Sequence, residues 1–146
     1  MIGFYTQNIT FSLKKKKVIR SWLEEIIRSE NKFPKNISII FCDDTYLSEI
    51  NRKFLNHETL TDIVTFDYNL GDKISGDIFI SIDRVGENAT KFKKSFSDEL
   101  CRVICHGVLH LSGYADKKQS EKLVMRAKED HYLLILYQDL KNFLHL

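Results

Sequence analysis

The residues best suited to chemistry lie in one stretch of twelve, Cys105 to Asp116, which contains two imidazoles and a carboxylate. His106 and His110 are four positions apart, so on a helix they project from one face on successive turns, close enough to share a metal ion. Gly113 is a natural helix terminator, and the turn that it makes is expected to bring Asp116 back towards both histidines. Three protein ligands with an open fourth position are typical of a catalytic zinc site.

The residue after the first histidine limits the classes of metalloenzyme to which this segment could belong. Zinc peptidases of the common helical pattern have a glutamate there, which acts as the general base, and this chain has Gly107. Glycine cannot accept a proton, so a peptidase of that type is disfavoured and any base must come from outside this segment. The remaining histidines have no partner at ligand spacing and are expected to have surface roles: His57, His131 and His145.

Length and composition indicate one ordinary globular domain spanning residues 1–146. Charged residues make up 29% and hydrophobic residues 43%, and the net charge of +2 is weak evidence for a nucleic-acid partner. The amino terminus lacks a signal-peptide pattern, and no segment approaches the roughly 20 apolar residues of a membrane-spanning helix. Three cysteines without a secretory signal favour a reducing compartment, so we expect a cytoplasmic protein; we interpret Cys101 and Cys105 as core residues rather than ligands.

Apolar periodicity and capping residues outline the secondary structure. Segments rich in β-branched and aromatic residues are expected to be strands: 2–7, 37–41, 62–66 and 76–82. Helices are expected after an N-cap at Ser12, over 46–55 after Asp43 or Asp44, over 84–92 after Asp83, from Ser97 through the histidines, and over about 120–140. A loop is expected at 56–60 and a turn at 69–72. The apolar side of the last helix is expected to comprise Leu123, Val124, Ala127, Leu134 and Leu140.

These elements predict an α+β fold with a small mixed four-stranded sheet and about five helices packed on it. Strands 62–66 and 76–82 are close enough in sequence to pair as a hairpin. The helix that carries the histidines is expected to be central, because it combines the ligand face with an apolar stripe that includes Leu100, Ile104 and Leu111. Gly107 in that stripe is expected to let a neighbouring element approach closely.

The stretch from His106 to Asp116 resembles the signature of the YbeY family, bacterial single-strand-specific endoribonucleases involved in ribosomal RNA maturation. Other blocks resemble the family in the same order: 51–54, 61–66, 76–80 and 99–100. The usual signature reads His-Gly-X-Leu-His-Leu-X-Gly-Tyr-Asp-His, and this chain follows it through Tyr114 and then has Ala115-Asp116. A second departure is Leu55, which stands where many relatives carry an arginine; Arg52, about one helical turn away, is the candidate to replace it.

The resemblance implies that His106, His110 and Asp116 bind one metal ion, commonly assigned as zinc. Zinc accepts a carboxylate oxygen, so an aspartate in place of the third histidine keeps three ligands and adds a negative charge. The expected reaction is cleavage of an RNA phosphodiester, with the metal activating water and polarising a phosphoryl oxygen. Asp62 is the candidate to orient that water and Arg52 the second catalytic candidate. The expected phosphate contacts are Thr61, Thr65, Lys117 and Lys118.

The resemblance further implies single-stranded ribosomal RNA as substrate, maturation of the 3′ end of 16S rRNA and ribosome quality control as processes, and the small ribosomal subunit or its associated proteins as partners. Three alternatives remain open at this point. The first is a non-catalytic ribosome-assembly or RNA-binding factor with a structural metal. The others are a metal-dependent hydrolase with a different substrate and, more remotely, an iron oxygenase with two histidines and one carboxylate.

Overall fold

A computed structural model describes residues 1–55 and 61–144 of the chain, with side chains as far as residue 141. The expected loop at 56–60, together with His57 and His145, lies outside the described residues. Four strands form one sheet in the order β1-β2-β4-β3. Their bounds are Ile2–Thr6 for β1, Phe33–Cys42 for β2, Ile63–Asp67 for β3 and Lys73–Ser81 for β4. All four expected strands are therefore present.

The sheet is mixed, as predicted. β1 pairs with β2 and β2 with β4 in parallel, whereas β3 and β4 form an antiparallel hairpin with Ile63 opposite Ile80 and Thr65 opposite Ile78. Gly71, with a φ of +60°, lies in the expected turn between the two hairpin strands. The fold is thus the predicted α+β arrangement with a four-stranded mixed sheet.

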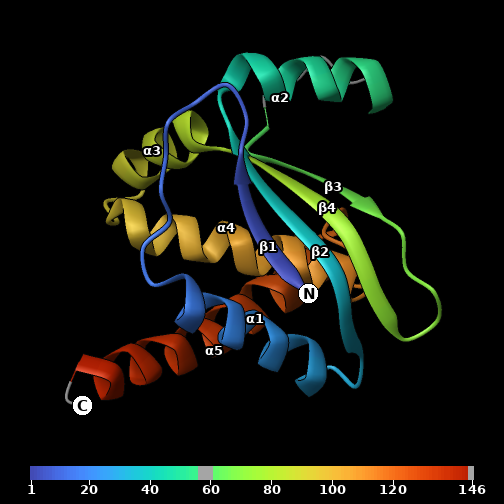
Figure 1. The fold of residues 1–146 in the computed structure, drawn as a ribbon, viewed down its shortest axis with the longest axis vertical. Helices are drawn as coiled ribbons and strands as arrows, with labels where there is room; N and C mark the ends of the chain where they lie inside the picture. Colours follow the sequence, from blue (N-terminus) through green and yellow to red (C-terminus); the bar gives the residue numbers. More distant parts are fainter. Residues whose placement is uncertain (56–60, 145–146) are drawn as a thin grey trace.

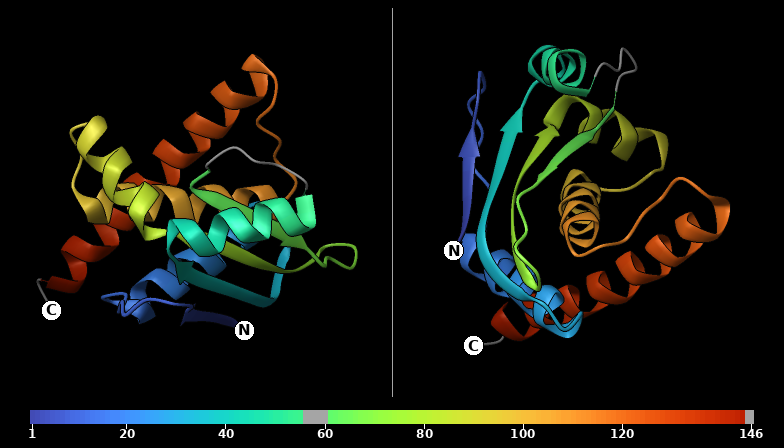
Figure 2. Two further views of the ribbon diagram at one scale, coloured as in Figure 1. Left: turned by 90° about the horizontal axis from the view of Figure 1, so that it is seen from above. Right: turned by 90° about the vertical axis from the view of Figure 1, so that its right-hand side faces the viewer.

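Five α-helices accompany the sheet in the described part of the chain (Figure 1). Their bounds are Lys16–Ser29 for α1, Asp44–Ile50 for α2, Ile82–Lys91 for α3, Phe96–Leu111 for α4 and Gln119–Leu144 for α5, with a π-helical segment, η1, at Asn51–Leu55. α4 lies between the sheet and α5, while α2 packs on the opposite side of the sheet near its edge (Figure 2). The helix that carries the histidines is therefore central, as expected.

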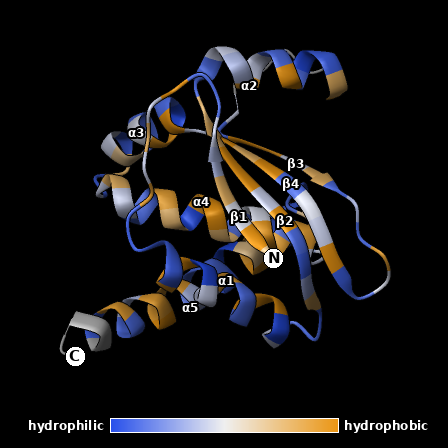
Figure 3. Ribbon diagram, in the orientation of Figure 1, coloured by the Kyte–Doolittle hydropathy of each residue, from blue (hydrophilic) through white to orange (hydrophobic). Residues whose placement is uncertain are grey.

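α4 is held against the sheet by the predicted apolar stripe. Leu100, Ile104 and Leu111 are all buried, and the hydrophobic strands and α4 face one another across this core (Figure 3). Gly107 is the point of closest approach: a Cβ at this position would lie 2.8 Å from Ile63 Cδ1 and 2.9 Å from Ile78 Cγ2. The absent side chain therefore sets how near the ligand-bearing helix comes to β3 and β4.

Two helices begin earlier than predicted, α3 by two residues and α4 by one. α3 is capped by Ser81 rather than Asp83, and the Ser81 hydroxyl accepts a hydrogen bond from the Arg84 N–H at 3.3 Å. α4 is capped by Ser95 rather than Ser97, again through a serine hydroxyl and the N–H three residues on, at 3.1 Å. Each segment offers two capping residues, and the earlier one lengthens the helix.

The start of α1 also differs from the prediction. Ser12 is not its N-cap; the helix begins after Lys15, which has a left-handed backbone with a φ of 57° and no capping bond from its side chain. Leu13 is buried in the main core, so the chain is anchored there before it turns into the helix. The predicted cap at Asp43 is confirmed, because its carboxylate accepts the Tyr46 N–H at 2.8 Å.

The predicted apolar side of α5 is wrong except at Leu140, which is partly buried against the main core. Leu123 is 63% exposed and Leu134 is 59% exposed, and Val124 and Ala127 are exposed as well. The side that packs inwards consists of Met125, Glu129, Tyr132, Leu133 and Leu136. It contains a carboxylate and a phenol because these groups have hydrogen-bond partners on α4 and α1, which a hydrophobic pattern does not reveal. No helix in the described ranges is long and apolar enough to span a membrane.

We predict that Gly107→Ala lowers the free energy of unfolding by about 1–3 kcal/mol, because the new methyl group overpacks the contact with the rigid Cγ2 of Ile78. Gly86 is a matched control: it lies within α3, and a Cβ there meets only the Phe96 ring at 3.9 Å. Gly86→Ala should therefore raise stability by up to about 1 kcal/mol through helix propensity. Chemical denaturation of both variants checks this prediction, and equal effects of the two substitutions would contradict it.

Candidate metal centre

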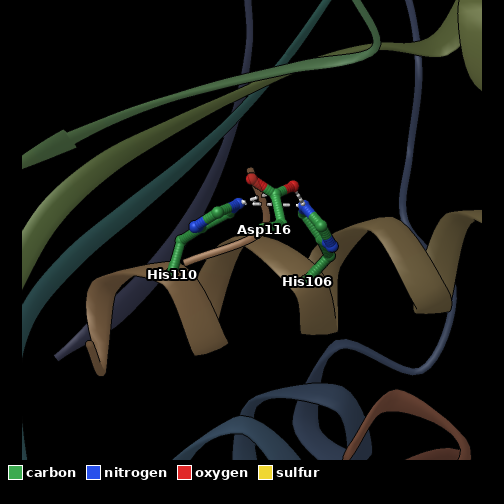
Figure 4. A group of neighbouring side chains, drawn as sticks. All are labelled: His106, His110 and Asp116. Atoms are coloured by element: carbon green, nitrogen blue, oxygen red, sulfur yellow. Dashed lines mark hydrogen bonds and ion pairs between the residues drawn. The ribbon is translucent and has the colours of Figure 1, made fainter. Parts of the chain in front are cut away.

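Three side chains converge at the carboxyl-terminal half of α4 (Figure 4). His106 Nε2 lies 3.0 Å from His110 Nε2, and Asp116 Oδ2 lies 3.1 Å from the first nitrogen and 3.3 Å from the second. Ligands bound tetrahedrally to zinc at about 2.0–2.1 Å are separated from one another by roughly 3.3 Å. The described triangle of two nitrogens and one oxygen therefore has the size that a zinc ion requires.

The turn after α4 brings the third ligand into place. Gly113 has a φ of +113°, a conformation that residues with a side chain rarely adopt. The Gly113 N–H bonds to the His110 carbonyl at 3.0 Å, and the Tyr114 N–H bonds to the Leu109 carbonyl at 3.1 Å. These bonds close the helix end and reverse the chain, so that Asp116 faces the histidines, as predicted.

Hydrogen bonds to the outer ring nitrogens fix the direction of both imidazoles. His110 Nδ1 lies 2.8 Å from the Tyr114 carbonyl oxygen, and His106 Nδ1 lies 2.6 Å from Glu129 Oε2. Both partners are acceptors, so each Nδ1 carries a hydrogen, and Nε2 is the ring nitrogen left to present a lone pair to a metal. Two lone pairs and a carboxylate oxygen then face one another with no hydrogen between them. Such a set is satisfied by a cation, and its donors suit zinc.

The surroundings of the triangle are rich in carboxylates. Burial raises the pKa of Asp62, which is only partly offset by the nearby His106, and burial likewise raises the pKa of Glu99. Burial alone would lower the pKa of His106, but the hydrogen bond that His106 donates to Glu129 and the charges of Glu129, Asp116 and Asp62 outweigh it, and the pKa is raised. Burial is the main cause for Asp62 and Glu99, and neighbouring negative charge adds to all three shifts. A divalent cation would compensate that negative charge.

A cavity of about 330 Å³ lies beside the triangle. Its acidic and imidazole walls are Asp62, Glu99, His106, Asp116 and Glu129, and its basic walls are Arg102, Lys122 and Arg126. Asp62 is thus brought to the same cavity as His106 and Asp116, two of the three candidate metal ligands. Among the described residues, it is the only predicted catalytic or substrate-binding residue that lines this cavity.

The other predicted catalytic and phosphate-binding residues are not among the residues that line this cavity. Arg52 is exposed on η1, and Lys117 and Lys118 are exposed in the loop that directly follows Asp116. These three cations remain candidates for contacts with an extended polyanion that reaches beyond the cavity.

The two predicted threonines differ in their surroundings. The Thr61 hydroxyl accepts a hydrogen bond from Asn51 Nδ2 at 2.8 Å and donates one to the Ile63 carbonyl at 3.4 Å, so it joins the start of η1 to the start of β3. Thr65 pairs with Ile78, which meets α4 at Gly107, so Thr65 lies on the sheet face that carries α4.

Sequence reasoning missed the contribution of α5 to the site. Glu129, Lys122 and Arg126 all line the cavity, and Glu129 contacts a metal ligand directly. One signal was present: Glu129 lies four residues after Met125 and four before Leu133, in the middle of a helical stripe of bulky residues. A carboxylate in such a stripe indicates a buried group with a specific partner. The interpretation of Cys101 and Cys105 as core residues is confirmed.

A second polar cluster anchors the loop that carries the third ligand. The hydroxyls of Tyr114 and Tyr132 both donate to the Glu30 carboxylate at the end of α1, and Lys128 Nζ lies 3.1 Å from its Oε2. The Glu30 side chain is only 10% exposed. Because the Tyr114 carbonyl also holds His110, this cluster fixes the metal centre relative to α1 and α5.

Glu30 should make stability depend on pH. Burial alone raises its pKa, but the hydrogen bonds from Tyr114, Tyr132 and Lys128 outweigh it and hold the pKa below the usual range. The stabilisation is therefore present above the unfolded pKa of about 4.3 and is lost as pH falls through the lower folded value. Glu30→Gln should lower the free energy of unfolding at pH 7 by about 1–3 kcal/mol and flatten its decline between about pH 5 and pH 3.

Denaturation curves across this pH range measure the effect. Glu25→Gln is the control, because Glu25 lies exposed on the same helix. If the Glu30 and Glu25 variants showed the same stability and the same pH slope, the anchoring role of the cluster would be ruled out.

Comparisons with known proteins agree with this site. Residues 2–136 match the family described as Endoribonuclease YbeY. Curated relatives named Endoribonuclease YbeY include proteins of Flavobacterium psychrophilum, 51% identical over 94% of this chain and 97% of the relative, and Flavobacterium johnsoniae, 49% identical over 94% and 98%. A solution structure of a Thermotoga maritima protein is 28% identical, with a TM-score of 0.67, and the match covers 97% of this chain and 93% of that one.

The matched region includes every element that builds the metal centre: the hairpin, α4, the loop after it and the part of α5 that carries Glu129. From the ligand triangle and from matches over nearly its full length, this chain belongs to the YbeY endoribonuclease family.

Proposed function

We propose that this protein is a metal-dependent endoribonuclease that cleaves single-stranded RNA, with residues 1–146 acting as one domain. The observation that carries the proposal is the triangle of His106, His110 and Asp116 beside a cavity walled by a buried carboxylate, Asp62. The names of the relatives support the reaction class. We propose zinc as the metal because imidazole and carboxylate donors at this separation suit it.

We assign separate roles in RNA cleavage to the acidic and the basic residues of this site. Bound metal would supply Lewis-acid chemistry, lowering the pKa of water and polarising a phosphoryl oxygen. Asp62 accepts a proton from the attacking water. Burial raises the pKa of Asp62 towards neutral pH, and a general base is most effective when its pKa is near the working pH. Lys122 and Arg126, which line the cavity, offset the charge of the phosphate that enters it, and the exposed Lys117, Lys118 and Arg52 contact the flanking backbone.

We extend the proposal to maturation of the 3′ end of 16S rRNA in the cytoplasm, with the small ribosomal subunit or its proteins as partners. The family resemblance and the absence of glutamate at position 107 support this substrate over a peptide. Gly107 is packed against Ile63 and Ile78, so that position has no room for a base.

His110→Ala should lower cleavage of a single-stranded RNA oligonucleotide by more than about 100-fold, because even partners outside the ligand set are worth 10–100-fold. His131→Ala is the matched control, since His131 is exposed on α5 away from the cavity walls. Metal content and chelator sensitivity are measured on the same preparations. Equal cleavage with and without metal, or full activity of His110→Ala, would refute the proposal. Metal-independent RNA binding without cleavage would instead favour a non-catalytic factor.

Asp62→Asn should reduce kcat by roughly 10²–10⁴-fold, because an amide cannot accept the proton. KM for the oligonucleotide and the metal content should change little, since Asp62 is not among the three ligand residues. Steady-state kinetics with parallel metal analysis separate these effects. A variant with wild-type kcat would remove Asp62 from the mechanism.

A further inference from the structure

Glu129 is a buried carboxylate that the ligand set does not include. Its side chain is 6% exposed, and burial of a charged group is costly unless hydrogen bonds and opposite charge compensate it. Both of its oxygens are engaged: Oε2 lies 2.6 Å from His106 Nδ1, and Oε1 lies 2.9 Å from Arg102 Nη1. Arg126 Nη1 approaches Oε1 at 3.7 Å. The carboxylate therefore joins α5 to two consecutive turns of α4.

We propose that Glu129 is the positioning residue of the metal centre, holding His106 in the ring orientation and tautomer that direct Nε2 at the metal. This inference rests on the proposed metal-dependent function. A carboxylate can only accept, so the hydrogen of His106 stays on Nδ1 and the lone pair on Nε2 is left for the metal. The hydrogen bond also opposes rotation of the ring away from His110 and Asp116.

Arg102 completes this arrangement from one turn earlier on α4. Its guanidinium forks between Glu129, through Nη1 at 2.9 Å, and Asp130, through Nη2 at 2.6 Å. Its charge-assisted hydrogen bond to Oε1 holds the carboxylate of Glu129 in place beside His106. Asp130 is 59% exposed and binds Arg102, whereas the partner of His106 Nδ1 is Glu129.

The two histidines differ in how they are held. His110 is held by the backbone carbonyl of Tyr114, a group that no substitution removes. His106 is held by a side chain on another helix, so its orientation depends on one residue identity and on the packing of α5. His110 is thus held by the loop that follows α4, whereas His106 is held by α5.

Glu129→Gln isolates this role with almost no change in shape. Glutamine has one acceptor oxygen and one NH2 group, whereas Glu129 faces a donor on each side, from His106 and from Arg102. Whichever way the amide turns, one donor meets the NH2 group. Asp130→Asn is the matched control, because it weakens the other branch of the Arg102 fork and leaves the His106 bond in place.

The experiment measures zinc affinity of metal-depleted, full-length protein by competition with a chromogenic chelator, with thermal unfolding of the metal-free variants as the folding check. We expect Glu129→Gln to bind zinc about 10–100-fold more weakly than wild type, and Asp130→Asn to stay within about twofold. Wild-type affinity in a folded Glu129→Gln protein would overturn the proposal, as would an equal loss in Asp130→Asn. If the wild-type protein itself bound no zinc, the proposed function would fail rather than the role of Glu129.

Nuclear magnetic resonance of the wild-type protein gives a test that needs no variant. The zinc-loaded protein should show a slowly exchanging His106 ring N–H proton, assigned to Nδ1 and shifted downfield by its short hydrogen bond to the carboxylate. In Glu129→Gln this signal should move upfield or exchange with solvent. Its absence from the wild-type spectrum, or coordination of zinc through Nδ1, would contradict the proposal even if the variant failed to fold.

Discussion

The structure depends on keeping three electron-rich atoms within 3.0–3.3 Å of one another. Two lone pairs and a carboxylate oxygen repel at that separation unless a cation lies between them. A rigid helix fixes two of the donors, and a glycine turn returns the third. α4 is in turn held by the sheet through Gly107 and by α5 through Glu129. Glu30, at the end of α1, holds the loop after α4 through Tyr114.

The need to hold these three donor atoms in place explains why α5 is not a simple amphipathic helix. Its inward side carries Glu129 and Tyr132, whose partners are on α4 and α1, while Leu123 and Leu134 face outwards. Buried polar groups contribute little net stability but specify a unique arrangement once all of their hydrogen bonds are made. In this protein the unique arrangement is the one that directs His106 Nε2 towards His110 and Asp116.

Local patterns were sufficient to predict the strands, the hairpin, the central helix and the ligand triangle. The three candidate ligands could be predicted from the sequence because one helical turn separates His106 from His110, and a single glycine turn separates His110 from Asp116. The start of α3 differed from the prediction because two capping residues compete two positions apart. The role of Glu129 was missed because its partner is 23 residues away in the chain, and local periodicity carries no information about such a contact.

The central claim is that two imidazoles and one carboxylate hold a metal ion beside the cavity. X-ray absorption spectroscopy at the zinc edge of the purified, zinc-loaded protein tests it most directly. The account predicts one zinc per chain with two imidazole nitrogens at about 2.0–2.1 Å, one carboxylate oxygen at about 2.0–2.2 Å and one further light atom. A sulfur neighbour at about 2.3 Å, which would implicate a cysteine such as Cys105, or a third imidazole would contradict it.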